Sequence, residues 1–344
     1  MLSVSVVIPV LNAARTLPLC LAALSRLDPK PNEIIFVDNG SSDGSQGLLK
    51  AFESDHAGWA VRCLVQPTRG ASAARNTGIR AAAGEVIAFT DADCEPDVDW
   101  VQRLVVPFQD AAVGGVAGRI VGDPGGSVLE LFSSLYTLQS PEQPSVHTTW
   151  TPWAGGFPTA NLAVRRSLLE QLGGFDESVA IYGEDYDLCA RLYRQGSAVA
   201  YRPEAVVRHH HRSTLAGLLR QAYGFGYSHA YLFGRHQPKG LWLELPRYAK
   251  VWPSAPVNGW LDGASADKKL FGILALGWLY QPLGWLLPLY ALWMIRGAGK
   301  RAALAGVPPS VAVAAVLAGL LLAKSAALTA GRWRGSWKYG AVCL

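Results

Sequence analysis

Two aspartates, Asp91 and Asp93, follow the short apolar run Val86–Phe89. The run is rich in residues typical of buried strands, and alternate residues of a strand point to the same side. Both carboxylates can therefore face the crevice at the carboxyl end of a sheet, where α/β folds bind ligands. Neighbouring carboxylates repel unless a cation lies beside them, and hard divalent cations prefer oxygen ligands. The pattern favours a metal site that holds a diphosphate; the alternative is a solvated acidic turn.

A second acidic pair, Glu184 and Asp185, stands just before the helical pattern of Tyr186–Gln195. Carboxylates at a helix N-terminus are favoured by its exposed N–H groups, so helix capping is one interpretation. The other is that Asp185 is a general base and that Glu184 orients the substrate. A hydroxyl is a weak nucleophile at neutral pH and reacts faster when a carboxylate within hydrogen-bond reach accepts its proton. A base and a metal-held diphosphate together would support transfer of a group to a hydroxyl.

The elements that must position these residues alternate between strands and helices. Strand patterns cover Ser3–Pro9, Glu33–Val37 and Ala60–Val65, and helical patterns follow Thr16 and cover Ser72–Ala83. This alternation predicts βαβ units and a mostly parallel sheet with right-handed crossovers. Neither G-x-G-x-x-G nor G-x-x-x-x-G-K-[ST] occurs at a strand–helix junction, which fits a metal ion rather than a glycine-rich loop as the phosphate holder.

The middle of the chain is expected to build the acceptor side. A strand is predicted over Val113–Val121 and a helix over Val128–Gln139. Thr151–Asn161 is rich in aromatic residues, glycine and proline, which suits contact with the apolar faces of sugars or, alternatively, a structural loop. Two short strands are predicted over residues 198–208, separated by Pro203.

Five motifs in this order resemble those of family 2 glycosyltransferases with the GT-A fold. The resemblance covers roughly residues 3–215. The motifs are VVIPVLN at residues 6–12, VDNGSSDG at 37–44, ARNTG at 74–78, FTDAD at 89–93 and GEDYDL at 183–188.

The resemblance implies a nucleotide site at the ends of the first strands. The loop from Pro9 to Asn12 would lie along the base, and Asp38 would bind the base or ribose. Arg69 and the pair Arg75-Asn76 would lie near the base and the diphosphate. Open alternatives are a turn-forming role for Asp38, a helix-surface charge for Arg75 and a plain loop role for Asn12.

The resemblance also implies a Mn²⁺ or Mg²⁺ site. Asp93 corresponds to the direct ligand, whereas Asp91 corresponds to a residue that binds the ribose or donor sugar and is a second candidate ligand. In the run His209-His210-His211, His209 resembles an additional ligand and His211 is the second choice, since imidazole can bind manganese-like ions. Exposed loop histidines are the alternative.

The implied activity is inverting transfer of a sugar from a nucleotide diphosphate sugar, most commonly a UDP-sugar, to an acceptor hydroxyl. Processive relatives that extrude polysaccharide carry a Gln-x-x-Arg-Trp motif. This motif is absent from the sequence, so single or limited addition is expected. The acceptor is expected to be a lipid-linked or cell-envelope glycan, and a peptide-derived or small natural product is the alternative. A non-catalytic sugar-nucleotide-binding membrane protein is the alternative of another class. Two other enzyme classes fit less well. A glycoside hydrolase would also use two carboxylates but needs no metal or nucleotide fold. A nucleotidyltransferase would usually carry a glycine-rich loop after the first strand, and the loop Val10–Arg15 has no glycine.

Composition sets broader limits. The 344 residues suggest about two domains, and the net charge of +5 is mild. Basic residues are not gathered into one helix or tail in the first 200 residues, so no nucleic-acid partner is expected. Five scattered cysteines without a Cys-x-x-Cys pair argue against zinc or disulfides and for a reducing compartment. The first residues lack a basic n-region, so no signal peptide is expected.

The C-terminal third is apolar. Phe271–Ile295 holds 25 residues without a charge and Ala302–Ala323 holds 22, and runs of 18 or more are candidate membrane spans. Pro282 and Pro288 interrupt the first run, and its aromatic residues also fit a segment lying in the membrane interface. We expect a membrane-bound tail with the catalytic part on the cytoplasmic face. A buried helical subdomain or a dimer interface is the alternative.

The predicted fold class is therefore α/β, with a GT-A type, mostly parallel sheet followed by an α-helical hydrophobic region. The predicted division is a nucleotide-sugar-binding half at residues 1–110, an acceptor and base half at 111–215, and a helical, membrane-associated region at 216–344. Leu215–His236 is expected to be helical. Residues 237–269 are expected to be an irregular lid or interfacial segment.

Overall fold

The computed structural model divides the chain into two compact units. It describes residues 2–138, 140–151, 154–179, 182–211, 214–237, 239–245, 248–253 and 258–344. The sheet unit comprises Met1–Asp123, Leu138–Ala180 and Glu184–His211. The helical unit comprises Pro124–Thr137, Ile181–Gly183 and Arg212–Leu344. The predicted halves 1–110 and 111–215 both contribute strands to one sheet of the sheet unit.

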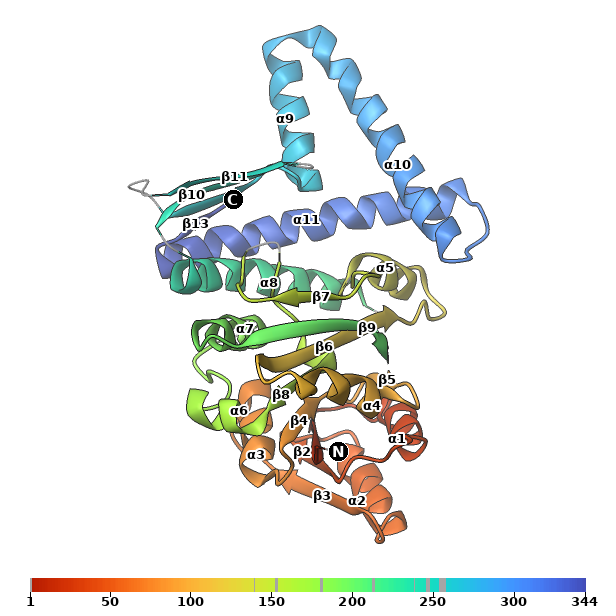
Figure 1. Cartoon of the computed structure of the whole chain (residues 1–344). Coiled ribbons are helices and arrows are strands. Elements are labelled where there is room, and N and C mark those ends of the chain that lie inside the picture. The colour runs from red at the N-terminus through yellow and green to blue at the C-terminus, as the bar shows by residue number, and fades with distance from the viewer. Residues whose placement is uncertain are drawn as a thin grey trace. The chain divides into compact units, whose positions relative to one another are not determined.

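That sheet has the strand order β3-β2-β1-β4-β8-β6-β9-β5, and β7 pairs with β9 (Figure 1). From β3 to β4 the strands are parallel, as predicted, while β8 is antiparallel to both β4 and β6. The α/β fold class is confirmed, with a parallel first half and a mixed second half. The strands are β1 (Val4–Val10), β2 (Glu33–Asp38), β3 (Ala60–Val65), β4 (Val86–Phe89), β5 (Cys94–Pro96), β6 (Val113–Gly122), β7 (Ser145–His147), β8 (Leu162–Arg165) and β9 (Ala198–His209).

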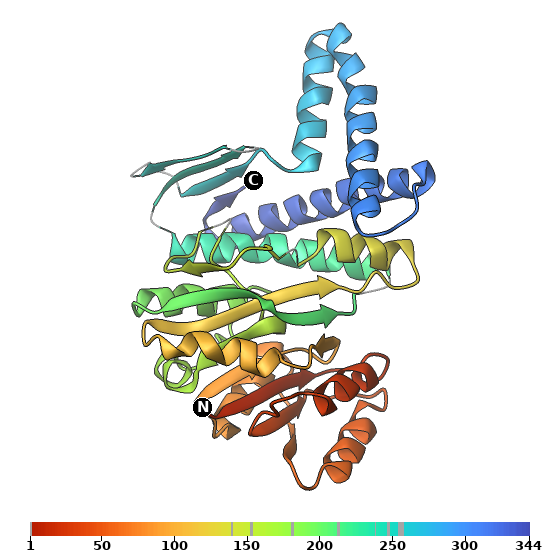
Figure 2. The same ribbon diagram turned by 45° about the vertical axis from the view of Figure 1, so that its right-hand side comes forward.

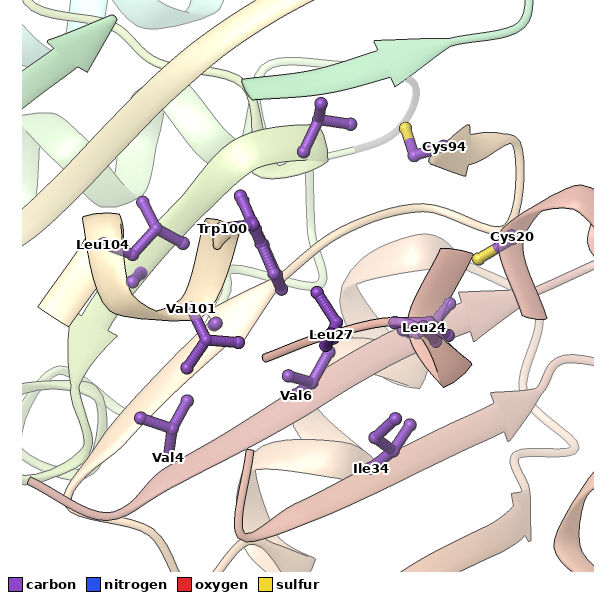
Figure 3. Packing of buried hydrophobic residues seen from close by; sticks show 14 of the residues in the cluster. Val4, Val6, Cys20, Leu24, Leu27, Ile34, Cys94, Trp100, Val101 and Leu104 are labelled. Carbon is purple, nitrogen blue, oxygen red and sulfur yellow. The ribbon is translucent and has the colours of Figure 1, made fainter. Parts of the chain in front are cut away.

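Helices connect the strands and cover the sheet. They are α1 (Leu17–Ser25), α2 (Ser45–Asp55), α3 (Ala71–Ala81), α4 (Trp100–Val105), α6 (Arg166–Leu172) and α7 (Glu184–Arg194), with 3₁₀ turns η1 (Val106–Gln109) and η2 (Thr159–Asn161). Figure 3 shows Val4 and Val6 of β1 with Leu24 of α1 and Trp100 of α4 in the buried core. Because residues i and i+2 of a strand face the same side, Val4 and Val6 join one layer of this core.

Strand β9 runs through Pro203, so the prediction of two separate strands is wrong. Its pairing with β6 shifts register between Gly118 and Arg119. Because of this shift, the strand pairing does not need a hydrogen bond from Pro203, which has no N–H. The local backbones are so close that a Cβ on Gly118 would lie 2.2 Å from the Ala205 oxygen. Glycine at position 118 therefore makes this irregularity possible.

Asn161 connects three elements of the sheet unit through hydrogen bonds. Its Oδ1 accepts the Trp100 indole N–H at 2.8 Å, and its Nδ2 donates to the carbonyls of Arg119 and Ala205 at 2.9 and 2.8 Å. The residue is 1% exposed, so water cannot replace these hydrogen bonds. A buried, fully used amide of this kind fixes α4, β6 and β9 relative to one another.

The helical unit combines helices with a small sheet. Its helices are α5 (Val128–Tyr136), α8 (Leu215–His236), α9 (Ala266–Leu279), α10 (Leu286–Leu304) and α11 (Val311–Tyr339), and η3 (Gln281–Trp285) joins α9 to α10. The sheet order is β11-β10-β12-β13, with β10 (Gly240–Leu245), β11 (Tyr248–Pro253), β12 (Gly259–Asp262) and β13 (Val342–Cys343). The prediction that 237–269 is irregular is therefore wrong. Long-range pairing, including β12 with the C-terminal β13, organises this segment and has no local sequence signal.

Two helices of this unit, α8 and α11, pack with almost no space between their backbones. A Cβ on Gly226 would lie 1.9 Å from the Leu328 oxygen, and one on Gly331 would lie 2.0 Å from the Tyr223 oxygen. Small residues permit such contact. Within the described residues α11 alone is long and apolar enough to cross a bilayer, judged by length and composition. The first apolar run is instead divided between α9 and α10, which form a hairpin (Figure 2).

We predict that Asn161→Ala lowers the free energy of unfolding of the sheet unit by about 3 kcal/mol or more. The change leaves the Trp100 N–H and two carbonyls buried without partners. Chemical denaturation followed by circular dichroism measures the loss. Gln102→Ala, at an exposed position on α4, is the control and should change the value by less than about 0.5 kcal/mol. Equal stability of the two variants would contradict the prediction.

Candidate active site

Strand pairing brings Asp93 and His209 together. In the antiparallel pair β5–β9, Cys94 lies opposite His209, and the His210 N–H donates to the Asp93 carbonyl at 2.8 Å. His209 Nε2 lies 3.5 Å from Asp93 Oδ1. The rings of His209 and His211 lie 4.6 Å apart, so these alternate residues share one side.

His210 faces away from that pair. Its Nε2 lies 2.5 Å from Glu95 Oε1, and its Nδ1 lies 3.0 Å from Asp123 Oδ2. The structure therefore separates the three consecutive histidines into two groups. A ligand role for His209, or for the second choice His211, stays a prediction.

The donor atoms of this group fit a divalent cation. His209 Nδ1 is buried and has no hydrogen-bond partner within the described residues, so no hydrogen bond through this nitrogen fixes the ring. Cys94 is the third member of the cluster, but burial, with the charges of Asp93 and Asp91, raises the pKa of its thiol well above the usual range. Cys94 also lies in the hydrophobic core. Asp93 and His209 are the better candidates to hold Mn²⁺ or Mg²⁺.

Asp91 is not part of this metal cluster; it binds Arg75 instead. One guanidinium nitrogen of Arg75 lies 2.9 Å from Asp91 Oδ1 and the other lies 2.8 Å from Glu184 Oε1. The Arg75 side chain is only 5% exposed, which excludes the helix-surface alternative. Burial alone would lower the pKa of Arg75, but Asp91 and Glu184 more than offset this and raise it. The positively charged Arg75 on α3 thus links Asp91, just after β4, to Glu184 at the start of α7.

Asp185 is buried beside this ion-pair network. Burial raises the pKa of its carboxyl to about 7, and the charge of Glu184 adds to the rise, whereas Arg75 and the N–H groups of Tyr186 and Thr159 oppose it. Its Oδ1 accepts the Tyr186 N–H at 2.9 Å, so the helix-capping interpretation describes part of its role. A carboxyl with a pKa near neutrality can also exchange a proton with a bound hydroxyl.

The predicted base-binding residues connect the loops after β1 and β2. Asn12, with φ of 50°, accepts the Ser42 N–H at 2.9 Å, and its own N–H donates to Ser41 Oγ at 2.9 Å. Asp38 is buried at the end of β2 and accepts Gln46 Nε2 at 2.7 Å. Pro9 lies near the end of β1. These contacts are structural, and contact of Pro9, Asn12 and Asp38 with a nucleotide stays a prediction.

Asn76 and Arg69 differ in how firmly they are held. Asn76 is buried, and its amide donates to the Phe175 carbonyl at 2.9 Å and to Glu177 Oε1 at 2.8 Å. Its Oδ1 accepts the Phe175 N–H at 2.8 Å, so the side chain positions the turn after α6. Arg69 is exposed before α3. Direct donor contacts of both residues stay predictions.

Sequence reasoning missed Asn39. Its Nδ2 donates to the carbonyls of Gln66 and Thr68 at 2.9 and 2.7 Å, and its Oδ1 accepts the Gly70 N–H at 2.8 Å. It therefore shapes the loop that leads into α3 and Arg75. Its position directly after Asp38 at a strand end was the only available signal.

The predicted acceptor segment Thr151–Asn161 reaches the start of α7. Pro152 and Trp153 lie outside the described residues. A Cβ on Gly156 would lie 2.7 Å from the Tyr186 ring, so the segment packs directly against the residue after Asp185. Phe157 stacks on Tyr201 with ring centroids 5.9 Å apart.

Comparisons with known proteins give related matches. The family model for glycosyl transferase family 2 matches residues 5–173. The pre-mycofactocin glycosyltransferase of Mycobacterium tuberculosis is 35% identical over 242 residues, which are 69% of this chain and 48% of that relative, so the chain spans about half its length. The N-acetylglucosaminyl-diphospho-decaprenol L-rhamnosyltransferase of the same species is 29% identical over 283 residues, covering 72% of this chain and 85% of the relative.

A solved structure supports the fold. The mannosyltransferase PcManGT from Pyrobaculum calidifontis, in complex with GDP-Man and Mn²⁺, matches with a TM-score of 0.58 and 24% identity, covering 98% of this chain and 88% of that chain. The topology, the order of the motifs and these matches agree, and the chain belongs to glycosyl transferase family 2.

Proposed function

We propose that the protein is a metal-dependent, inverting glycosyltransferase that moves a sugar from a nucleotide diphosphate sugar to an acceptor hydroxyl. The observation that carries the proposal is the Arg75 network. Through one buried guanidinium, Asp91 on the donor side is joined to Glu184, the neighbour of the buried Asp185. This contact supports one site that contains both the proposed donor-binding residue and the proposed base.

In this mechanism Asp185 accepts the proton of the acceptor hydroxyl as that oxygen attacks the anomeric carbon. The bond from the anomeric carbon to the diphosphate oxygen breaks as the new glycosidic bond forms, so the configuration inverts. Glu184 is held by Arg75 and orients the acceptor. Because burial keeps the Asp185 pKa near 7, its carboxylate is a stronger base than an exposed aspartate and is still partly ionised at neutral pH.

Asp93 and His209 would hold the divalent ion. When bound, such an ion offsets the negative charge that develops on a leaving diphosphate. Arg75, Asp91 and the loop containing Asn12 would orient the donor. This assignment is supported by the closeness of the Asp93 oxygen to His209 Nε2 and by the lack of a hydrogen bond to His209 Nδ1 among the described residues.

For the donor we propose a UDP-sugar, the commonest in the family, with single or limited addition. For the acceptor we propose a lipid-linked or cell-envelope glycan, supported by the 29% identity to a rhamnosyltransferase named for a decaprenol-linked acceptor. The 35% identity to a pre-mycofactocin glycosyltransferase supports the alternative of a peptide-derived acceptor. For the location we propose the cytoplasmic face of the cell membrane; the apolar α11 and the α9–α10 hairpin support membrane attachment.

Asp185→Asn should lower kcat for sugar transfer by at least about 100-fold, because an amide cannot accept the proton. Nucleotide affinity should change little, since the replacement is isosteric. Transfer assays and calorimetric nucleotide binding measure the two effects. Glu170→Gln, which removes an exposed carboxylate paired with Arg166, is the control. Transfer at the unaltered rate in Asp185→Asn would refute the base assignment.

The pH dependence of sugar transfer should also reflect the raised pKa of Asp185. The base acts when deprotonated, so kcat/KM should rise with pH and reach half its plateau near pH 7. Glu184→Gln should move this midpoint to lower pH, because the neighbouring negative charge that raises the Asp185 pKa is removed. A pH–rate profile of each variant tests this. A midpoint that stays fixed or moves upward in Glu184→Gln would contradict the proposed coupling.

His209→Gln should weaken Mn²⁺ binding at least about tenfold, the effect expected from losing one ligand or its support. His210→Gln is the matched control, because His210 contacts Glu95 and Asp123 instead of the proposed site. Calorimetric titration with Mn²⁺ and a nucleoside diphosphate gives both affinities. An equal loss of Mn²⁺ affinity in the two variants would contradict the assignment of His209 as a ligand.

A further inference from the structure

The hairpin formed by α9, η3 and α10 exposes an unusual amount of apolar surface. Its uncharged run is Phe271–Ile295, and aromatic residues lie near its tip. Trp278 is 85% and Trp285 is 77% exposed. Contiguous apolar surfaces of this kind mark sites of contact with a partner or a membrane. Other exposed members of the run are Phe271, Leu279, Tyr280, Leu289, Leu292 and Trp293.

A cavity of about 270 Å³ lies at the root of this hairpin, between α9, α10 and α11. Tyr290 and Trp293 of α10 stack with ring centroids 5.7 Å apart and form part of its wall. Leu321 of α11 adds apolar surface, and Lys269 and Lys324 also line the cavity. Apolar walls with two ammonium groups suit an amphiphile whose polar end is an anion.

Neither lysine has a carboxylate partner within ion-pair distance among the described residues. Lys269 Nζ lies 5.7 Å from the centre of the Trp293 ring, and Lys324 donates to the Tyr136 carbonyl and lies 3.5 Å from Thr137 Oγ1. The printed contacts of both lysines in the described part of the chain are thus with uncharged groups, and the nearby Arg301 adds further positive charge beside Lys324.

One acid, Asp267, lies at the cavity wall, and Asp262 is paired with other cations. Asp267 accepts the Ser325 hydroxyl. Asp262 lies 2.7 Å from Arg332 and 3.9 Å from Lys268. Two lysines and one carboxylate leave the cavity with a net positive charge that an anionic group would offset.

We propose that this cavity binds the phosphate of an anionic membrane lipid while the hairpin tip enters the same leaflet. The proposal rests on the membrane attachment included in the proposed function. Trp278 lies nine positions after Lys269, about 14 Å along a helix. That is less than half of a hydrocarbon core of about 30 Å, so a phosphate at Lys269 would leave the tip within one leaflet.

The tip suits such an environment. Tryptophan and tyrosine are enriched where lipid headgroups meet the hydrocarbon, and the tip carries Trp278, Tyr280 and Trp285. Backbone polar groups in lipid need internal partners. The Tyr280 N–H donates to the Leu276 carbonyl and the Leu283 N–H to the Tyr280 carbonyl, while Pro282 has no N–H to satisfy. The lysines below would meet the phosphate layer.

The test is calorimetric titration of the full chain with short-chain phosphatidic acid, phosphatidylcholine of the same chain length, and inorganic phosphate. We expect saturable binding of phosphatidic acid, at least tenfold tighter than of the other two. Lys269→Gln should weaken it at least about tenfold, as expected from the loss of a charged hydrogen bond. Lys300→Gln, which removes an exposed charge farther along α10, should change it less than about twofold.

Three results would overturn the proposal. Inorganic phosphate that binds as tightly as phosphatidic acid would indicate a free-anion site. Equal effects of Lys269→Gln and Lys300→Gln would indicate attraction by net charge alone. The third result is absence of saturable phosphatidic acid binding in a chain that still binds a nucleoside diphosphate, and it would leave the transferase proposal intact.

The hairpin tip needs a separate variant. Trp278→Ser combined with Trp285→Ser should reduce co-sedimentation with vesicles that contain phosphatidic acid at least about tenfold, because two large apolar side chains no longer enter the lipid. Light scattering on the same protein shows whether the face joins two copies of the chain instead. A variant that becomes monomeric and still binds vesicles as the parent does would overturn the membrane assignment of the tip.

Discussion

The buried charge of Arg75 is the constraint on which the site depends. A guanidinium away from water is stable only with partners, and here the partners are the carboxylates of Asp91 and Glu184. The end of β4 and the start of α7 are far apart in the chain, and this arginine fixes one to the other. Asp185 lies buried beside Glu184; burial and this like charge raise the pKa of its carboxyl to about 7, although Arg75 opposes the rise.

The rest of the sheet unit supports that arrangement through buried amides. Asn39 shapes the loop before α3, Asn76 holds the turn after α6, and Asn161 joins α4 to β6 and β9. Each amide uses both its donor and its acceptor within the fold. The antiparallel pairing of β5 with β9 then brings Asp93 to His209. In the helical unit, glycines bring α8 and α11 into direct backbone contact, while the α9–α10 hairpin keeps its apolar surface exposed.

Local patterns were sufficient for much of the fold. The strands ending near Val10, Asp38 and Val65 and the helix Leu215–His236 follow from apolar runs and turn residues, and the structure contains them. Contacts between distant residues were not predictable in this way. The β10–β12 sheet depends partly on the pairing of β12 with β13. Strand β9 continues through Pro203 because Gly118 allows the backbone of β6 to lie close to the Ala205 carbonyl. At the site, the family resemblance indicated His209, whereas the attachment of Asp91 to Arg75 instead of the metal cluster depends on contacts between distant residues of α3 and α7.

The most direct test of the account is thermal stabilisation of the chain by uridine, guanosine and thymidine diphosphates, each with and without Mn²⁺. A ligand at about 100 times its dissociation constant stabilises the folded state by about 2.7 kcal/mol, which is readily measured. The account predicts a shift with one nucleotide that requires Mn²⁺ and disappears in Asp93→Ala. A shift that is independent of Mn²⁺, or no shift with any nucleotide, would contradict it.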